Sequence, residues 1–218
     1  MKTSKIAGLD WPRIACDLDR EGYALLPGLL DAEQIHTLLA ANPEQQLANW
    51  RAAFYAQLLP IAQRWNQRMG IAADYPASLT TTPDSVILSH LYENDFQPLH
   101  QNSNGERTFP LQLVMLLSEP GVDFSGGELV MTEQRPRMQS RPMVLPLTKG
   151  DAALITVAQR PVSGSNGDYR VNLKQAISRV LRGNRLGLEL LFHDRSIDPG
   201  LTLDQGTLAF DAPAVAGQ

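Results

Sequence analysis

The chain has a single cysteine, no long apolar run and no block of like charges. Cys16 cannot form an internal disulfide, and its apolar spacing within a predicted helix indicates a buried thiol. No stretch of about 18 apolar residues occurs, as a membrane-spanning helix would need. The mixed, charged stretch after Met1 also lacks the apolar centre of a signal peptide. We therefore expect a soluble, cytoplasmic protein.

The charge distribution limits the classes of partner. The formal net charge is −4, and no basic stripe is present that would attract a phosphate backbone or an acidic membrane. We therefore expect neither nucleic acid nor a membrane as a partner, and a small molecule, peptide or protein instead. At 218 residues the chain is long enough to form one domain with a substantial core, and we expect no second domain.

The region from about residue 10 to residue 70 is predicted to be helical. A short amphipathic helix is expected over Pro12–Arg20, followed by Gly22 as a stop. Asn42 and Pro43 predict the start of a longer helix, whose large apolar residues repeat every four positions. Pro60 is expected to kink or split this helix. These aromatic and aliphatic residues are expected to pack the helices onto a sheet.

From about residue 84 to residue 194 the sequence changes to short apolar runs separated by Gly, Pro and Asn, a pattern typical of an all-β barrel or sandwich. The predicted strands are Val86–Tyr92, Phe109–Leu117, Glu128–Thr132, Met143–Leu147, Ala152–Val157, Arg170–Leu181 and Leu186–Phe192. The polar segment Arg160–Asp168 is predicted to be a loop that flanks the mouth of the barrel. Residues 195–218 are predicted to form a loosely packed tail.

Four segments occur in an order that carries information about function. They are His100-Gln101-Asn102, Asp123–Leu129, Gln175–Arg185 and Phe192-His193-Asp194. Together they resemble the catalytic core of the Fe(II)/2-oxoglutarate-dependent dioxygenases, in particular a group of small prokaryotic oxygenases, over most of residues 20–195. The resemblance implies an α+β fold, in which N-terminal helices pack against a double-stranded β-helix, the jelly-roll barrel of cupin-like proteins. It also implies that His193 and Asp194 are structural.

Members of this superfamily hold iron with an H-x-D/E pair and a distant histidine, which leaves three coordination positions open. His100 matches the first ligand, but Asn102 stands where the family has an acidic residue. Gln175 stands where the family has its second histidine. Amide side chains are poor ligands for iron compared with imidazole and carboxylate, so we predict a vestigial metal site that holds Fe(II) weakly or not at all.

The carboxylate-binding half of the family site is retained. Arg185 follows Gln175 by ten residues, and the resemblance implies that it binds the distal carboxylate of 2-oxoglutarate through paired hydrogen bonds. An alternative for Arg185 is a structural ion pair with a core carboxylate such as Glu189. His100 has an alternative too, as a retained histidine with no catalytic role.

Three functions remain open from these residues. The first is a lapsed oxygenase that keeps a carboxylate-binding barrel and works as a binding or regulatory protein, for instance with an active relative as its protein partner. The second is a metal-independent enzyme, in which His100 or Tyr92 serves as general acid or base on a carboxylate substrate. The third is an active 2-oxoglutarate-dependent hydroxylase whose metal site is rescued by His90 or Asp95.

Overall fold

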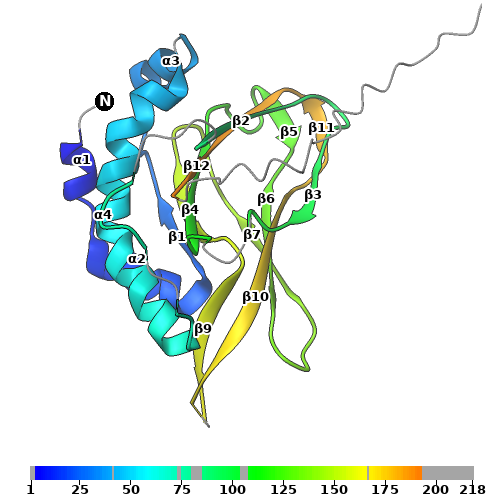
Figure 1. Cartoon of the computed structure of the whole chain (residues 1–218). Coiled ribbons are helices and arrows are strands. Elements are labelled where there is room, and N and C mark those ends of the chain that lie inside the picture. The colour runs from blue at the N-terminus through cyan, green and yellow to red at the C-terminus, as the bar shows by residue number, and fades with distance from the viewer. Residues whose placement is uncertain are drawn as a thin grey trace, which may run out of the picture.

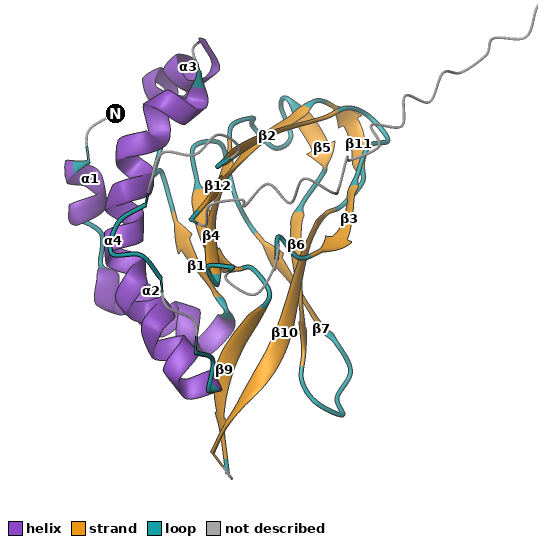
Figure 2. Ribbon diagram, in the orientation of Figure 1, coloured by secondary structure: helices purple, strands orange, loops and turns teal. Residues whose placement is uncertain are grey.

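The computed structural model describes residues 3–40, 42–72, 75–79, 85–103, 108–165 and 167–192. The fold contains two antiparallel sheets, and a layer of helices from the N-terminal part packs mainly against one of them (Figures 1 and 2). No helix within these ranges is both long and apolar enough to cross a membrane. His193, Asp194 and the predicted tail lie outside the described residues.

Within the described residues the helices are α1 (Ser4–Ala7), α2 (Trp11–Glu21), α3 (Ala32–Ala40) and α4 (Pro43–Met69). α2 confirms the predicted first helix and ends at Gly22 in the left-handed conformation. At the start of α4, Asn42 Oδ1 accepts a hydrogen bond of 3.0 Å from the Glu44 amide, as an N-cap does.

α4 runs through Pro60 without interruption, so the prediction of a split at this residue is wrong. A proline inside a helix removes one backbone hydrogen bond and crowds the preceding turn. Here both halves of the helix bury large residues in the same core, among them Trp50, Phe54 and Trp65, all with 0% exposure. Tertiary packing on both sides of Pro60 therefore holds the helix together.

The prediction of a buried Cys16 is also wrong. This side chain is exposed, although it lies between the buried residues Ile14 and Leu18 in sequence. A helix turns by about 100° per residue, so a residue two positions from each end of an i, i+4 pair lies on the opposite face. α2 buries only the stripe that contains Ile14 and Leu18.

Two antiparallel sheets form the barrel. The first has the order β1 (Tyr23–Leu26), β8 (Ala152–Thr156), β4 (Leu111–Leu116), β12 (Arg185–Leu191) and β2 (Val86–Leu91). The second has the order β3 (Gln97–His100), β10 (Gly167–Ile177), β6 (Leu129–Gln134) and β7 (Arg141–Leu145), with β9 (Gln159–Gly164) paired to β10. A short ribbon is formed by β5 (Phe124–Gly126) and β11 (Val180–Gly183). The predicted α+β class with a jelly-roll barrel is confirmed.

The molecule has two hydrophobic cores, one between the helices and the first sheet and one between the two sheets. Successive side chains of β12 point alternately into these two cores. Leu188, Leu190 and Phe192 belong to the core between the first sheet and the helices. Arg185, Gly187 and Glu189 occupy the alternate positions, which face the space between the sheets because successive strand residues point to opposite faces. The same alternation on β4 directs Gln112 and Val114 into that space. Polar groups are thereby placed inside the barrel.

Two predictions for the second sheet are corrected. The segment Arg160–Asp168 is not a loop, because it contains most of β9 and the start of β10, which pair as a hairpin. The predicted strand Arg170–Leu181 is interrupted between β10 and β11, where the Ser178 amide donates to the Glu128 carbonyl at 3.0 Å. Polar composition suggested a loop, but β9 has one side on the core and one in solvent.

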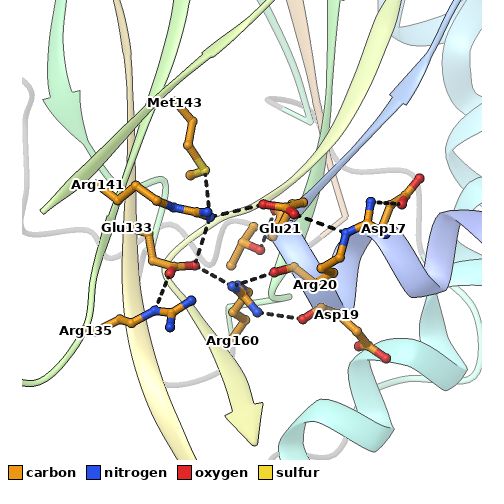
Figure 3. Close-up of polar contacts among 11 residues, drawn as sticks. Asp17, Asp19, Arg20, Glu21, Glu133, Arg135, Arg141, Met143 and Arg160 are labelled. Carbon is orange, nitrogen blue, oxygen red and sulfur yellow. Dashed lines mark hydrogen bonds and ion pairs between the residues drawn. The ribbon is translucent and has the colours of Figure 1, made fainter.

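Arg160 on β9 connects the sheets to the helical layer (Figure 3). Its side chain is 1% exposed and its guanidinium forms an ion pair with Glu133 of β6, which is equally buried. Arg160 Nη1 also donates to the Asp19 carbonyl at 2.6 Å, and Nη2 donates to the Arg20 carbonyl at 3.0 Å. These carbonyls end α2, so one side chain fixes the position of the helix relative to the barrel.

Candidate functional site

The structure brings His100, Asn102 and Gln175 into one cluster inside the barrel. His100 ends β3 and is the direct partner of Gln175 on β10. The Gln175 Nε2 atom lies 3.2 Å from His100 Nε2. Asn102 follows β3 by two residues and reaches the same cluster through Gln112 and Glu189. The three positions singled out from the sequence are thus neighbours.

Glu189 of β12 is the centre of this cluster. Its Oε2 atom accepts hydrogen bonds from Asn102 Nδ2 at 2.7 Å, Gln112 Nε2 at 3.3 Å and Gln175 Nε2 at 3.5 Å. Asn102 Nδ2 also donates to Gln112 Oε1 at 2.9 Å, and Gln112 Nε2 donates to Gln175 Oε1 at 2.9 Å. Each amide nitrogen therefore uses both of its hydrogens. We call these four residues the amide–carboxylate network.

The neighbours of His100 determine which of its ring nitrogens carries the proton. Nδ1 lies 2.9 Å from the Pro98 carbonyl, which can only accept. Nε2 faces the Gln175 amide nitrogen, which can only donate. With the Gln175 amide in this orientation, His100 has its proton on Nδ1, and the Nε2 lone pair accepts a hydrogen bond.

These residues do not fit the iron site of the superfamily. No group of three His, Cys, Asp or Glu residues that could hold a metal ion occurs within the described part of the chain. The cluster offers one imidazole and one carboxylate, and amide hydrogens already bind His100 Nε2 and one of the two carboxylate oxygens, Glu189 Oε2. A facial triad needs two imidazoles and a carboxylate with their lone pairs directed at one point.

Arg185, at the start of β12, lies in the same interior and is 2% exposed. Its Nε donates to the Gly127 carbonyl at 2.7 Å, and its terminal nitrogens make no hydrogen bond or ion pair with the described residues. Burial lowers the pKa of Arg185 to about 10, although the carboxylate of Glu189 acts in the opposite direction. The guanidinium is therefore charged at neutral pH and has donors available for an anion.

Two glycines make room for this side chain. A Cβ atom on Gly127 would lie 2.9 Å from Arg185 Cδ, and one on Gly187 would lie 2.7 Å from Arg185 Nη1. Both distances are shorter than any ordinary contact of a Cβ atom. Arg185 thus extends from its own strand position over Gly187, in the direction of Glu189, yet the two charged groups form no ion pair among the described residues. The alternative of a structural Arg185–Glu189 pair is wrong for this geometry.

The candidate rescue ligands lie outside the cluster. His90 on β2 is the direct partner of Leu186, so it is on the face of the sheet opposite to Arg185 and Glu189. Its ring stacks on Tyr92 at 4.3 Å between centroids. The Asp95 carboxylate accepts from the Tyr92 amide at 2.8 Å. His36 is exposed on α3.

Sequence reasoning missed Gln112 as a member of the site and assigned Glu189 only a structural alternative. Each is a single polar residue in an otherwise apolar strand, Leu111–Leu116 for Gln112 and Leu186–Leu191 for Glu189. Buried amides and carboxylates require partners, so two such residues in neighbouring strands are a signal for a shared polar cluster. The near-continuous apolar run of Phe109–Leu117 predicts a strand buried on both faces, which does not by itself indicate a site.

Comparison with known proteins identifies the family. Residues 37–195 match the model of the family Oxygenase-NA, described as an oxygenase catalysing oxidative methylation of damaged DNA. An uncharacterized protein of Mycobacterium tuberculosis, found in two strains, is 36% identical over 154 residues. The alignment covers 66% of this chain and 66% of the relative, so less than two thirds of the relative's length is matched.

Solved structures show the same fold at low sequence identity. A prolyl 4-hydroxylase of Phytophthora capsici is 14% identical with a TM-score of 0.54, over 96% of this chain and 72% of that one. A 2OG-Fe(II) oxygenase-family oxidoreductase of Burkholderia pseudomallei is 13% identical with a TM-score of 0.52, over 86% and 92%. A prolyl-4-hydroxylase of Pseudomonas putida is 13% identical with a TM-score of 0.50, over 86% and 96%. The chain therefore belongs to the Oxygenase-NA family, within the superfamily of 2-oxoglutarate- and Fe(II)-dependent oxygenases.

Proposed function

We propose that this chain is a divergent member of its superfamily that has lost iron-dependent turnover and keeps a carboxylate-binding barrel, acting as a binding or regulatory protein. The observation that carries the proposal is the amide–carboxylate network at the vestigial metal positions. Three amides direct N–H groups at the Glu189 carboxylate, where an iron site would direct lone pairs at a cation.

The energetic argument concerns the ligand atoms. An ion placed between His100 and Glu189 would require the Gln175 amide to turn away from His100 Nε2, and it would lie beside N–H groups that Asn102 and Gln112 direct at Glu189. Buried amides that lose their partners each cost about 1–3 kcal/mol. Loss of a single group that supports a metal ligand lowers metal affinity about 10- to 100-fold, and replacement of two ligands lowers it further. Iron binding is opposed by both effects.

The binding part of the proposal rests on Arg185. Its guanidinium is buried and charged, and its terminal nitrogens have no partner among the described residues. A buried charge without a partner is costly, and a ligand carboxylate would satisfy it through paired hydrogen bonds. The expected ligand is a small carboxylate such as 2-oxoglutarate, and a protein partner such as an active relative fits the regulatory role.

Two alternatives remain as proposals of lower support. The first is an active oxygenase, which the family description favours. That description names damaged DNA, so it also favours a nucleic acid as a partner, whereas we expect none from the charge distribution. The described residues offer no metal ligand set for this activity. A metal-independent enzyme would use His100 as the base, but His100 Nε2 already accepts a hydrogen from Gln175.

Calorimetric titration with 2-oxoglutarate, with and without Mn(II) under anaerobic conditions, tests the proposal. We expect binding that does not depend on the metal and that Arg185→Met weakens at least about tenfold, which corresponds to about 1.4 kcal/mol. Arg182→Met is the matched control, because Arg182 is exposed on β11 and outside the cluster. Turnover of 2-oxoglutarate to succinate by iron-loaded protein would contradict the proposal.

A further inference from the structure

The interior of this barrel contains two buried opposite charges that do not form an ion pair with each other. Arg185 and Glu189 are four residues apart on the same face of β12, so their Cα atoms are separated by about 13 Å. Gly187 lies between them on the strand and has no side chain. The Arg185 guanidinium extends over Gly187, which shortens the distance between the charged ends. An ion pair would be the simplest arrangement, and it does not form among the described residues.

Arg185 on one side, and Glu189 with Asn102 on the other, offer opposite hydrogen-bonding groups. At one end, the Nη1 and Nη2 atoms of Arg185 are donors without a partner in the described residues. At the other end, Glu189 Oε1 and Asn102 Oδ1 accept no hydrogen bond from the described residues. The amide hydrogens beside these oxygens are all used, within the network or at His100 Nε2. The free groups are thus cationic donors at Arg185 and acceptors with negative charge at Glu189.

We propose that these groups in the barrel interior bind a short zwitterion, an amino acid whose carboxylate binds Arg185 and whose ammonium group binds Glu189 and Asn102. This inference rests on the proposed carboxylate-binding function and names its ligand class. A dicarboxylate held at Arg185 would bring its second anionic group against the Glu189 carboxylate, with no metal ion to neutralise either. An ammonium group instead supplies three hydrogens to acceptors that lack donors.

The electrostatic reason for selectivity is the low exposure of both charges, 2% for Arg185 and 6% for Glu189. Charges inside a protein are poorly screened. The Glu189 carboxylate therefore attracts a cationic group, and repels an anionic group, more strongly than it would in water. Specificity of this kind arises as much from repulsion of the wrong ligand as from attraction of the right one. Because amides stand in place of iron ligands, the Glu189 carboxylate is the dominant charge in the amide–carboxylate network.

Matched pairs of ligands test the inference on the wild-type protein. Amino acids with a terminal ammonium group and two to five carbons are titrated by calorimetry, each beside the dicarboxylate of equal carbon number. We expect at least one amino acid to bind about tenfold more tightly than its dicarboxylate, a preference of about 1.4 kcal/mol. Glu189→Gln should remove this preference, because the amide keeps the shape and an acceptor for the network but loses the charge. Thermal unfolding of the variant checks that it is folded.

The outcomes separate this inference from the proposed function. Dicarboxylates that bind as tightly as the amino acids, with affinity lost in Arg185→Met, would overturn the zwitterion and leave the carboxylate site in place. Absence of binding by both ligand series and by 2-oxoglutarate would overturn both proposals. A preference for amino acids that persists in Glu189→Gln would show that Glu189 does not bind the ammonium group and would overturn the assignment.

Discussion

At the scale of single residues, Arg185 depends on the absence of a side chain at Gly187. Because Nη1 would lie 2.7 Å from a Cβ atom at that position, the end of the arginine must move when one is added. Gly187 is in a regular part of β12 and pairs with Leu116 and Ser89, so its backbone needs no conformation special to glycine. Space for the guanidinium is the specific requirement here.

Gly187→Ala is therefore predicted to weaken the binding of 2-oxoglutarate by about tenfold, since a displaced guanidinium loses the alignment of its paired hydrogen bonds. The fold should be retained, because the far end of a flexible side chain absorbs the clash. Titration calorimetry measures the affinity, and Gly8→Ala is the control, because its added Cβ would lie 3.6 Å from the nearest atom. Unchanged affinity in Gly187→Ala would place the ligand away from Arg185.

The residues of the cluster around His100 could be identified from the sequence, but their interactions could not. The spacing of His100, Asn102, Gln175 and Arg185 within the family motifs was sufficient to predict that they share the barrel. The bonding partner of each amide depends on which strands lie opposite, and sequence spacing does not give this. Glu189 is the centre of the network because β12 pairs with β4, which carries Gln112, and because its side chain also reaches Gln175 on β10.

At the scale of elements, the turn from α2 into β1 has little tolerance for a side chain. Gly22 has a φ angle of +80°, and a Cβ atom there would lie 2.7 Å from Leu173 Cδ2 and 3.0 Å from Arg160 Nε. Gly22 thus ends α2 and packs against side chains of β9 and β10. Both the backbone conformation and the contact with the barrel favour glycine at this position.

Gly22→Ala is predicted to lower the free energy of unfolding by about 2–4 kcal/mol, from about 1–2 kcal/mol of backbone strain together with overpacking. Urea denaturation measures the change. Gly28→Ala is the matched control, since Gly28 also has a positive φ angle of +58° but nothing within 4 Å of the added atom. Equal losses for the two variants would mean that packing against Leu173 and Arg160 contributes nothing.

Element boundaries were predicted well where local signals were strong and poorly where packing decided. The N-cap at Asn42 and the stop at Gly22 are local features, and both were found. The hairpin of β9 and β10 was interpreted as a loop because Gly and Asn are frequent in it. Its strands exist because Arg160 and Val171 bury one face of the hairpin, which is a property of the whole fold.

At the scale of the whole molecule, a cluster of charged side chains joins the helical layer to the barrel, and its centre, Arg160 with Glu133, is buried (Figure 3). Glu133 forms ion pairs with Arg160 and with Arg135, the latter at 2.8 Å. Arg141 reaches Glu21 of α2 at 3.2 Å. A buried pair is costly to break on one side only, because the remaining charge is left without its partner.

Arg160→Met is predicted to lower the free energy of unfolding by about 3–5 kcal/mol, because it removes a partner of buried Glu133 and the bonds to the end of α2. Urea denaturation is again the measurement. Arg68→Met provides the control, since the Arg68–Asp168 pair is partly exposed, at 24% and 26%, and should contribute at most about 1 kcal/mol. Similar losses in both variants would contradict a special role for Arg160.

The same cluster predicts a dependence of stability on pH. Burial raises the pKa of Glu133, but hydrogen bonds from Arg135 and Arg160 lower it more, so that it lies below its usual value of 4.5. A lowered pKa in the folded state stabilises the fold above the unfolded value, and this contribution is lost as the pH falls through the folded value. The difference in unfolding free energy between wild type and Glu133→Gln should therefore narrow below about pH 4.5. A difference in unfolding free energy that stays constant across this pH range would contradict the lowered pKa of Glu133.

The central claim is that amides around Glu189 have replaced an iron site while Arg185 still binds a carboxylate. Anaerobic equilibrium dialysis against Fe(II) tests it most directly, with wild type compared with the double variant Asn102→Asp/Gln175→His. We expect weak, substoichiometric iron in the wild type and an affinity at least about tenfold higher in the double variant, which restores a carboxylate and an imidazole. Tight stoichiometric iron in the wild type, or no gain in the variant, would contradict the account.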